Sequence, residues 1–328
     1  MSHIPVMLDY VIEHLAPSAG DVIVDGTFGG GGYSRRILES ADCVVFGIDR
    51  DPDAKGRAEP LGSDFGDRFT LLNGPFSEME ALVAEEGKSS VSAVVLDLGV
   101  SSFQLDEAGR GFSFMREGPL DMRMSQDGIS AADLVNHADE KDLADIIFQL
   151  GEERDSRRIA RQIVRERADS SFETTLQLAD TVERAVGGRR GKRTHPATKT
   201  FQALRMFVND ELGELAGGLM AAERLLGEDG RLVVVTFHSI EDRMVKSFLA
   251  DRSGKQEGGS RFMPEQVASG PAPSFENVRR VTAPDVAEVA ANARARSSRL
   301  RSAVRTSAPA WTDEFEIPVN LPSLSEVL

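Results

Sequence analysis

The feature that most constrains the fold of this chain is the repetition of short, almost continuously apolar segments, each followed by a turn and a helical pattern. Four such segments occur in the first part of the chain, at 21–25, 43–49, 69–73 and 93–97. Their β-branched residues predict strands, and strands that alternate with helices are typical of a parallel sheet covered on both faces. We therefore predict an α/β fold.

The alternation stops after Asp97, and the next strand-like run is at 231–235. Apolar residues at helical spacing fill the interval, so we expect an inserted all-helical domain. The predicted helices are at 142–150, 155–167, 174–186 and 197–226. The predicted organisation is a first core part at 1–105, the helical insert at 106–207, a second core part at 208–310 and an acidic tail at 311–328.

Composition limits the class of protein. The apolar runs are far shorter than the roughly 18 residues of a membrane-spanning helix, and the first residues lack the pattern of a secretory signal. Cys43 is the only cysteine, so neither an internal disulfide nor a cysteine-based zinc site is expected. We predict a cytoplasmic protein without a membrane partner or a metal site.

The net charge of −15 argues mildly against a nucleic-acid partner, but basic residues are clustered in two stretches without acids, at 184–205 and 292–305. Either stretch alone could be a solvated surface. Two of them in an acidic protein favour local contacts with a polyanion. The candidate contacts are Arg189, Arg190, Lys192, Arg193, Lys199, Arg205, Arg294 and Arg296.

A run of four glycines, 29–32, follows the first predicted strand. Glycines at this place let the backbone approach a bound cofactor, and the next helix directs its N–H groups at it. Asp49 ends the second strand, where a carboxylate can accept hydrogen bonds from ribose hydroxyls. The contiguous glycines do not match the usual dinucleotide pattern, and these features alone do not separate NAD from S-adenosylmethionine (SAM).

Asp97, at the carboxyl end of the fourth strand, separates the two possibilities. A nicotinamide enzyme needs a proton donor there, whereas a methyltransferase that acts on an amine needs hydrogen-bond acceptors. The exocyclic amine of cytosine is a poor nucleophile because its lone pair is delocalised, and a carboxylate acceptor raises its electron density. The competing interpretation is that Asp97 only caps the strand.

Methylation at C5 of cytosine requires a thiolate that adds to the ring. Cys43 lies at the start of the second predicted strand, at the edge of the sheet opposite the site. Covalent C5 chemistry is therefore not expected.

A series of motifs resembles the RsmH (MraW) family, in the order of that family and over residues 3–305. The motifs are at 3–8, 25–34, 47–52, 97–102, 104–106, 110–114, 118–124, 151–154, 195–198, 201–205, 237–243 and 294–298. Tyr33 stands where the family usually has His, and Phe103 where it usually has Pro.

The resemblance implies a Rossmann-like SAM-dependent methyltransferase sheet. It also implies methyl transfer from SAM to N4 of a cytidine in the decoding centre of 16S rRNA, in the small ribosomal subunit, so the basic residues above become candidate RNA contacts. Carried over by motif, the SAM contacts are Gly31, Gly32, Tyr33, Asp49, Phe76, Asp97 and Gln104. An aromatic ring at Phe76 suits stacking on adenine.

The catalytic candidates are Asp97, Ser101 and His238. His238 follows the fifth strand at the same rim as Asp97, and a structural role at that turn is an equal alternative. Phe112 and Phe114 are expected either to stack on a flipped base or simply to pack. Two other functions stay open, a non-catalytic SAM-binding ribosome-assembly factor and a nicotinamide-dependent oxidoreductase, as does the choice between monomer and homodimer.

Overall fold

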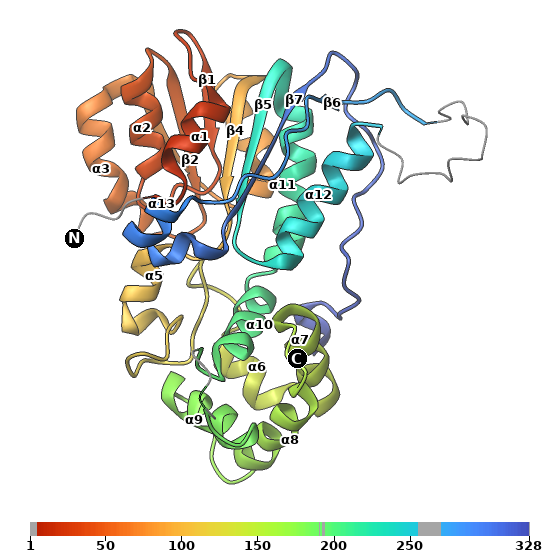
Figure 1. Ribbon diagram of the computed structural model, residues 1–328. Helices are drawn as coiled ribbons and strands as arrows, with labels where there is room; N and C mark the ends of the chain where they lie inside the picture. Colours follow the sequence, from red (N-terminus) through yellow and green to blue (C-terminus); the bar gives the residue numbers. More distant parts are fainter. Residues whose placement is uncertain (1–4, 190, 192–193, 255–269, 328) are drawn as a thin grey trace. The chain divides into compact units, whose positions relative to one another are not determined.

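The computed structural model describes residues 5–189, 191, 194–254 and 270–327, which divide into two compact units (Figure 1). The first consists of Met1–Gly99 with Gly213–Glu316, and the second of Val100–Leu212 with Ile317–Leu328. The predicted helical insert, 106–207, falls inside the second unit. The predicted acidic tail, 311–328, is divided between the two.

The first unit contains a seven-stranded sheet of order β3-β2-β1-β4-β5-β7-β6. The strands are β1 Val22–Asp25, β2 Val44–Asp49, β3 Phe69–Asn73, β4 Val91–Asp97, β5 Leu226–Thr236, β6 Phe275–Glu276 and β7 Arg299–Arg305. Strands β1 to β5 pair in parallel, and β7 is antiparallel to both β5 and β6. The predicted parallel α/β sheet is confirmed. Its order reverses between β1 and β4, and ligands of such sheets bind at the carboxyl ends of the strands beside this switch point.

Helices of the first unit cover the sheet, because each buries one apolar stripe against the strands. They are α1 Leu8–Leu15, α2 Gly32–Ser40, α3 Ala54–Phe65, α4 Met79–Glu85, α11 Glu211–Leu225, α12 Ser239–Arg252 and α13 Val286–Ala291. On one face, Val11 of α1, Ile37 of α2 and Leu61 of α3 share a fully buried cluster with Val45 and Val95 of the strands.

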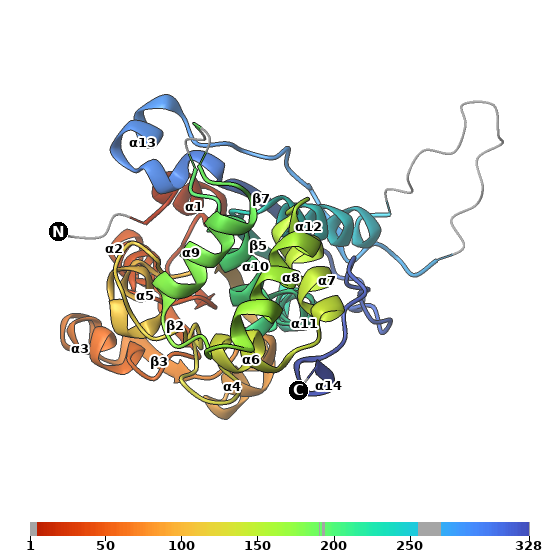
Figure 2. The ribbon, with the colours of Figure 1, turned by 90° about the horizontal axis from the view of Figure 1, so that it is seen from below.

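The second unit is helical in the part of the chain that the structure describes, and Figure 2 shows its helices from below. They are α5 Ser102–Asp106, α6 Ala131–His137, α7 Glu140–Gly151, α8 Ser156–Arg167, α9 Thr175–Ala185, α10 Thr198–Val208 and α14 Leu324–Val327. Leu143 and Ile147 of α7, Ile159 of α8, Leu178 of α9 and Leu204 of α10 are all fully buried. This small core forms because α7 packs on both α8 and α10, and α8 packs on α9.

The prediction of one helix over 197–226 is wrong, because the chain turns between α10 and α11. Asp210 has a φ of 45°, and Asn209 is 2% exposed. The Asn209 amide donates to the Met122 carbonyl at 2.7 Å, and its oxygen accepts the Met124 N–H at 2.8 Å. The apolar periodicity continues through the turn, so only these contacts with a distant loop reveal the break.

Strand β7 lies in a segment that we expected to be a basic surface. Leu300 and Ala303 are buried, and the backbone pairs with β5 along its length. Its arginines alternate with short residues and obscure the strand pattern. Separately, no helix among the described residues is long and apolar enough to cross a membrane.

We expect Asn209→Ala to lower the free energy of unfolding by about 2–3 kcal/mol, because it leaves the backbone groups of Met122 and Met124 without partners. Urea unfolding of the full-length protein measures this. Lys246→Ala, an exposed change on α12, is the control. A loss below about 0.5 kcal/mol for Asn209→Ala would contradict this account of the turn.

Candidate active site

The carboxyl ends of β1, β2 and β4 bring three aspartates to one edge of the sheet. Asp25 of β1 is level with Gly47 of β2 and with Val95 of β4. Asp49 and Asp97 follow two residues further along their strands. The parallel register therefore gathers these carboxylates at the switch point, next to the glycine-rich turn.

The glycine-rich turn leads from β1 into α2, and its packing explains two of the glycines. Gly31 has a φ of 73°, and a Cβ there would lie 2.7 Å from the ring of Phe28. A Cβ on Gly32 would lie 2.2 Å from Cγ of Pro5. A side chain at either position would clash, so the N-terminus of α2 can sit this close to the site only with glycine.

Asp49 holds the same turn from the end of β2. Its Oδ2 accepts the Gly29 N–H at 2.8 Å, and its Oδ1 accepts the Asp51 N–H at 2.9 Å. Burial raises the pKa of Asp49, and these bonds oppose the shift. Each carboxylate oxygen can accept a further hydrogen bond, so Asp49 both fixes the loop and retains capacity for ribose hydroxyls.

Asp97 is anchored through its backbone and has a free carboxylate oxygen. Its N–H donates to Oγ1 of Thr27 at 2.6 Å. Its Oδ1 is buried and has no hydrogen-bond partner among the described residues. Such an acceptor costs roughly 1–3 kcal/mol when unsatisfied, so a buried orphan in a native fold calls for an explanation. A ligand with an N–H group would satisfy it.

The charge environment of Asp97 is unusual. Burial, and then the negative charges of Asp25 and Glu241, raise the pKa of Asp97 well above its usual value. A hydrogen bond with the Tyr33 hydroxyl acts in the opposite direction. The Tyr33 ring is 3% exposed, and its hydroxyl also donates to the Val6 carbonyl. Tyr33 therefore supports Asp97 from inside the fold.

Asp25 and Thr27 were absent from the predicted site. The Asp25 carboxylate is fully buried and accepts the hydroxyl and N–H of Ser34, at 2.7 and 3.2 Å, and more weakly the Thr27 N–H, at 3.4 Å. Burial raises the pKa of Asp25 to about 6. Both residues lie in the motif at 25–34, and their position directly before the glycines was the available signal.

Phe76 and His238 follow β3 and β5. Phe76 lies so close to α11 that a Cβ on Gly218 would be 2.3 Å from its ring. His238 is the N-cap residue of α12 and is partly exposed. The buried Glu241 accepts the N–H groups of Phe237 and His238, at 2.9 and 3.0 Å. Glu241 thus fixes the segment that carries His238.

Ser101 and Gln104 belong to the second unit and form a capping box on α5. The Ser101 hydroxyl accepts the Gln104 N–H at 3.3 Å, and Oε1 of Gln104 accepts the Ser101 N–H at 3.1 Å. This reciprocal pair accounts for both residue types at the start of the helix. Their predicted roles toward substrate and SAM stay predictions.

The predicted phenylalanines pack within the second unit. Phe112 is 7% exposed, with the Arg110 guanidinium over its ring. The ring of Phe114 lies 4.7 Å from that of His195 and 4.8 Å from that of Phe201. Packing thus accounts for Phe112 and Phe114, whereas Phe103 and Phe148 of the same unit are exposed.

The three candidate RNA contacts that can be placed at 184–205 all have partners within the chain. Arg189 lies 3.4 Å from Glu183, and Lys199 donates to the Glu152 carbonyl at 2.7 Å. Arg205 is buried and makes two hydrogen bonds with Glu211, at 2.6 and 2.8 Å, and its predicted contact with RNA stays a prediction. The remaining three, Arg190, Lys192 and Arg193, lie outside the described residues.

The arginines of the second basic stretch, 292–305, differ in burial. Arg301 forms a two-bond ion pair with Asp242, and Arg305 is buried and donates to the carbonyls of Glu223 and Ser274. These two arginines stabilise the fold. Arg294 and Arg296, the two predicted RNA contacts of this stretch, are exposed in the short turn before β7.

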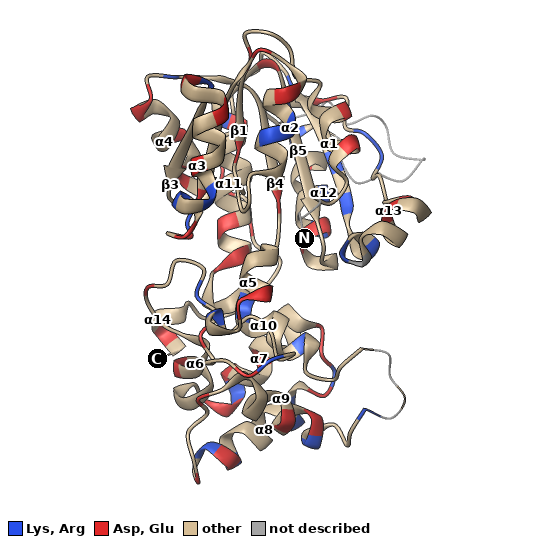
Figure 3. Ribbon diagram, turned by 90° about the vertical axis from the view of Figure 1, so that its left-hand side faces the viewer, with Lys and Arg blue, Asp and Glu red and all other residues tan. Residues whose placement is uncertain are grey.

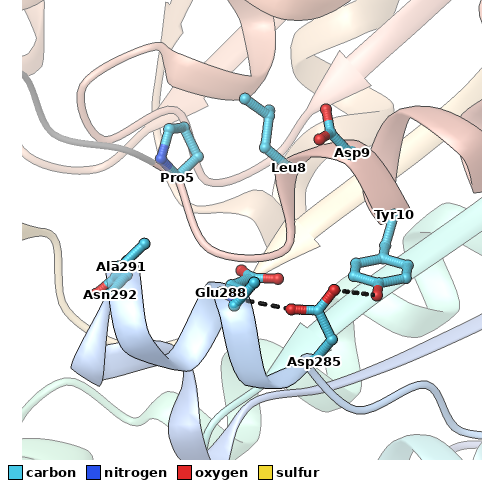
Figure 4. A pocket seen from close by; sticks show the side chains of 9 residues that line it. Pro5, Leu8, Asp9, Tyr10, Asp285, Glu288, Ala291 and Asn292 are labelled. Carbon is cyan, nitrogen blue, oxygen red and sulfur yellow. Dashed lines mark hydrogen bonds between the residues drawn. The ribbon is translucent and has the colours of Figure 1, made fainter.

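A separate hollow of about 440 Å³ lies between α1 and α13 (Figure 4). Asp285 accepts hydrogen bonds from the Tyr10 hydroxyl and the Glu288 N–H. Glu288 in turn accepts the Met7 N–H. These acids join the two segments. Neither here nor at any other place among the described residues does a group of three His, Cys, Asp or Glu side chains lie where it could hold a metal ion.

Three features define a Rossmann-like methyltransferase. The sheet is doubly wound, with antiparallel β7 beside β5, a glycine-rich turn follows β1, and carboxylates end β2 and β4. The chain belongs to the MraW methylase family, which matches residues 1–306.

The names of curated relatives are consistent with this family. The chain is 58% identical to the ribosomal RNA small subunit methyltransferase H of Hyphomonas neptunium, over 99% of this chain and 95% of the relative. It is equally identical to the protein of the same name from Caulobacter vibrioides, over 94% and 97%. An rRNA methylase structure from Streptococcus thermophilus is 10% identical, with a TM-score of 0.40 over 91% of this chain and 93% of the other.

The buried Asp25 gives a pH-dependent contribution to stability. Its pKa is raised in the folded state, to about 6, so this contribution is complete below the unfolded pKa near 4 and is lost as pH rises through 6. We expect Asp25→Asn to reduce the fall in unfolding free energy between pH 4.5 and 7.5 by on the order of 2 kcal/mol.

Urea unfolding at both pH values measures this change. Asp42→Asn is the control, because the Asp42 side chain is 86% exposed. If Asp25→Asn and the wild type lost equal stability over this range, Asp25 would not be the buried titrating group.

Proposed function

We propose that this protein transfers the methyl group of SAM to N4 of a cytidine in the decoding centre of 16S rRNA. In coarser terms, it is a SAM-dependent methyltransferase of small-subunit ribosomal RNA, in keeping with the names of relatives that align over almost its entire length. The observation that best supports the finer assignment is Oδ1 of Asp97 at the carboxyl end of β4, which is buried and has no partner among the described residues.

The residues at the switch point fit SAM. Backbone groups of the glycine-rich turn and the N-terminus of α2 would face its charged methionine end, Asp49 its ribose hydroxyls, and Phe76 its adenine. SAM supplies an electrophilic methyl group on a sulfonium. The predicted contact through Gln104 requires that its side chain serve SAM in addition to the α5 cap.

Asp97 provides the acceptor that an amine nucleophile needs. An amine N–H would donate to Oδ1 of Asp97, which raises electron density on the nitrogen, and this hydrogen bond stabilises the ionised carboxylate. The raised pKa of Asp97 also suits it to receive the proton that the amine releases when the new C–N bond forms. Thr27 and Tyr33 hold Asp97 in place, so the acceptor is organised before substrate arrives.

The substrate base must leave its stack to reach this edge. The amine of a paired, stacked cytidine is inaccessible, so the target is a nucleotide that is single-stranded or flipped. His238 follows β5 at the same edge of the sheet and is a candidate for contact with the base. The buried Glu241 positions the backbone of His238, while the imidazole is partly exposed.

The first test is methyl transfer from labelled SAM to small subunits from cells that lack this protein. Digested nucleosides would be separated by chromatography and identified by mass, with authentic N4-methylcytidine and 5-methylcytidine as standards. We expect N4-methylcytidine at one position. SAM and RNA binding without transfer would favour a non-catalytic assembly factor, and label at C5 would contradict the role of Asp97 as acceptor.

We expect Asp97→Ala to reduce the rate of methyl transfer by roughly 10²–10³-fold, because one hydrogen-bond group aimed at the reacting centre is removed. Single-turnover transfer to small subunits measures the chemical step. The variant should retain its fold, since Oδ1 has no partner within the described chain, the backbone N–H of residue 97 still donates to Thr27, and the Tyr33 hydroxyl keeps its bond to the Val6 carbonyl.

Two further variants make this test specific. Asp97→Asn keeps an acceptor oxygen without the charge and should lose less activity than Asp97→Ala. Glu59→Ala, an exposed change on α3, should transfer at the wild-type rate. Wild-type transfer by Asp97→Ala would show that the acceptor is another group.

A further inference from the structure

Helix α8 presents a row of arginines that the predicted RNA contacts did not include. Arg157, Arg158, Arg161 and Arg165 are all exposed. At 100° per residue, the four positions fall within an arc of about 100° and extend over about 12 Å of the helix. The buried residues Ser156, Ile159, Ala160 and Ile163 lie on the opposite side. We call these four side chains the α8 arginine face.

The α8 arginine face carries little neutralising charge. No carboxylate lies within 4 Å of Arg157, Arg158 or Arg165 in the part of the chain that the structure describes. Arg161 is 3.6 Å from Glu140, but the side chains are 73% and 46% exposed, so the pair is weak. The nearby Glu166 is held by Thr181, Gln162 and Arg184.

This arrangement contrasts with the basic stretch at 184–205. There, Arg184 pairs with Glu166, Arg189 with Glu183 and Arg205 with Glu211. Three arginines of the α8 face have no such partners among the described residues, although acids outnumber bases by 53 to 38 in this protein. In Figure 3, the ribbon positions of Lys and Arg (blue) and of Asp and Glu (red) are interspersed along the helices of this unit.

The side chains of the α8 arginine face indicate which class of partner it binds. A planar guanidinium binds phosphate through two parallel hydrogen bonds, and here all four cations are arginine. The face has no exposed large apolar residue, whereas protein interfaces need apolar or aromatic anchors and membrane-surface helices need an apolar side. A row of positive charges without apolar anchors suits the row of phosphates in a nucleic-acid backbone.

We propose that the α8 arginine face binds the phosphate backbone of the small-subunit rRNA and holds the substrate during methyl transfer. This inference rests on the proposed function for the identity of the RNA. Phosphate contacts position an RNA without reading its sequence, so the face contributes affinity and leaves the chemical step to the first unit.

The test compares the wild type with the full-length triple variant Arg157→Gln/Arg158→Gln/Arg165→Gln. Gln is nearly as good a helix former as Arg, so α8 should persist. Binding to free 16S rRNA and to assembled small subunits is measured at several salt concentrations, together with kcat, KM for the RNA and Kd for SAM. The matched control is Arg36→Gln/Arg224→Gln/Arg280→Gln, which removes the same charge from the first unit.

We expect the α8 variant to bind RNA roughly tenfold or more weakly and to raise KM similarly, with kcat and SAM binding unchanged. The slope of log K against log salt should fall by about 2–3, since each lost phosphate contact removes about 0.7–0.9. The control variant should change the slope by less than about one contact.

Several results would overturn the proposal. One is an unchanged slope of log K against log salt in the α8 variant, and another is an equal loss of RNA affinity in the control variant. A third is weaker binding to assembled subunits without weaker binding to free 16S rRNA, which would indicate a protein partner. Failure of the proposed function is distinguishable, because then the wild type would transfer no methyl group while RNA binding would still report on the face.

Discussion

The candidate site depends on the buried carboxylate of Asp25. It accepts the Ser34 hydroxyl and N–H and the Thr27 N–H, and so joins β1, the glycine-rich turn and α2. The Thr27 hydroxyl then receives the N–H of Asp97. This series of bonds runs from a buried anchor to the proposed acceptor. Burying Asp25 raises its pKa to about 6, which is the cost of holding a carboxylate in the core.

The hydrogen-bond partners of the polar side chains separate those with a structural role from those with a functional one. Asp49, Glu241 and Gln104 all have oxygens that accept backbone N–H groups, and they shape the turns around the site. Asp97 differs because its Oδ1 has no partner in the described chain. A buried acceptor is unfavourable until a donor reaches it, and for this reason it is the strongest local indication of where a substrate binds.

The predictions from sequence were most accurate where local pattern and tertiary environment agree. Strands that are apolar along their whole length indicate a parallel sheet covered by helices on both faces. The topology of such a sheet is enough to place the residues that end these strands at one edge. The turn at Asn209 was missed because its cause lies in the distant loop at Met122 and Met124. The ion pair of Arg205 was not predicted because its partner, Glu211, lies beyond a turn that the periodicity does not show.

The sequence by itself determined the alternation of the first five strands with helices, the placement of Asp49 and Asp97 at strand ends, and the family. These follow from periodicity, turn residues and motif order, which are local properties. Only the tertiary structure decided which charges are available. It paired Arg184, Arg189 and Arg301 with carboxylates, while Arg157, Arg158 and Arg165 remain exposed on α8. A count of charges cannot make that distinction, because ion pairing depends on distances between residues that only folding brings together.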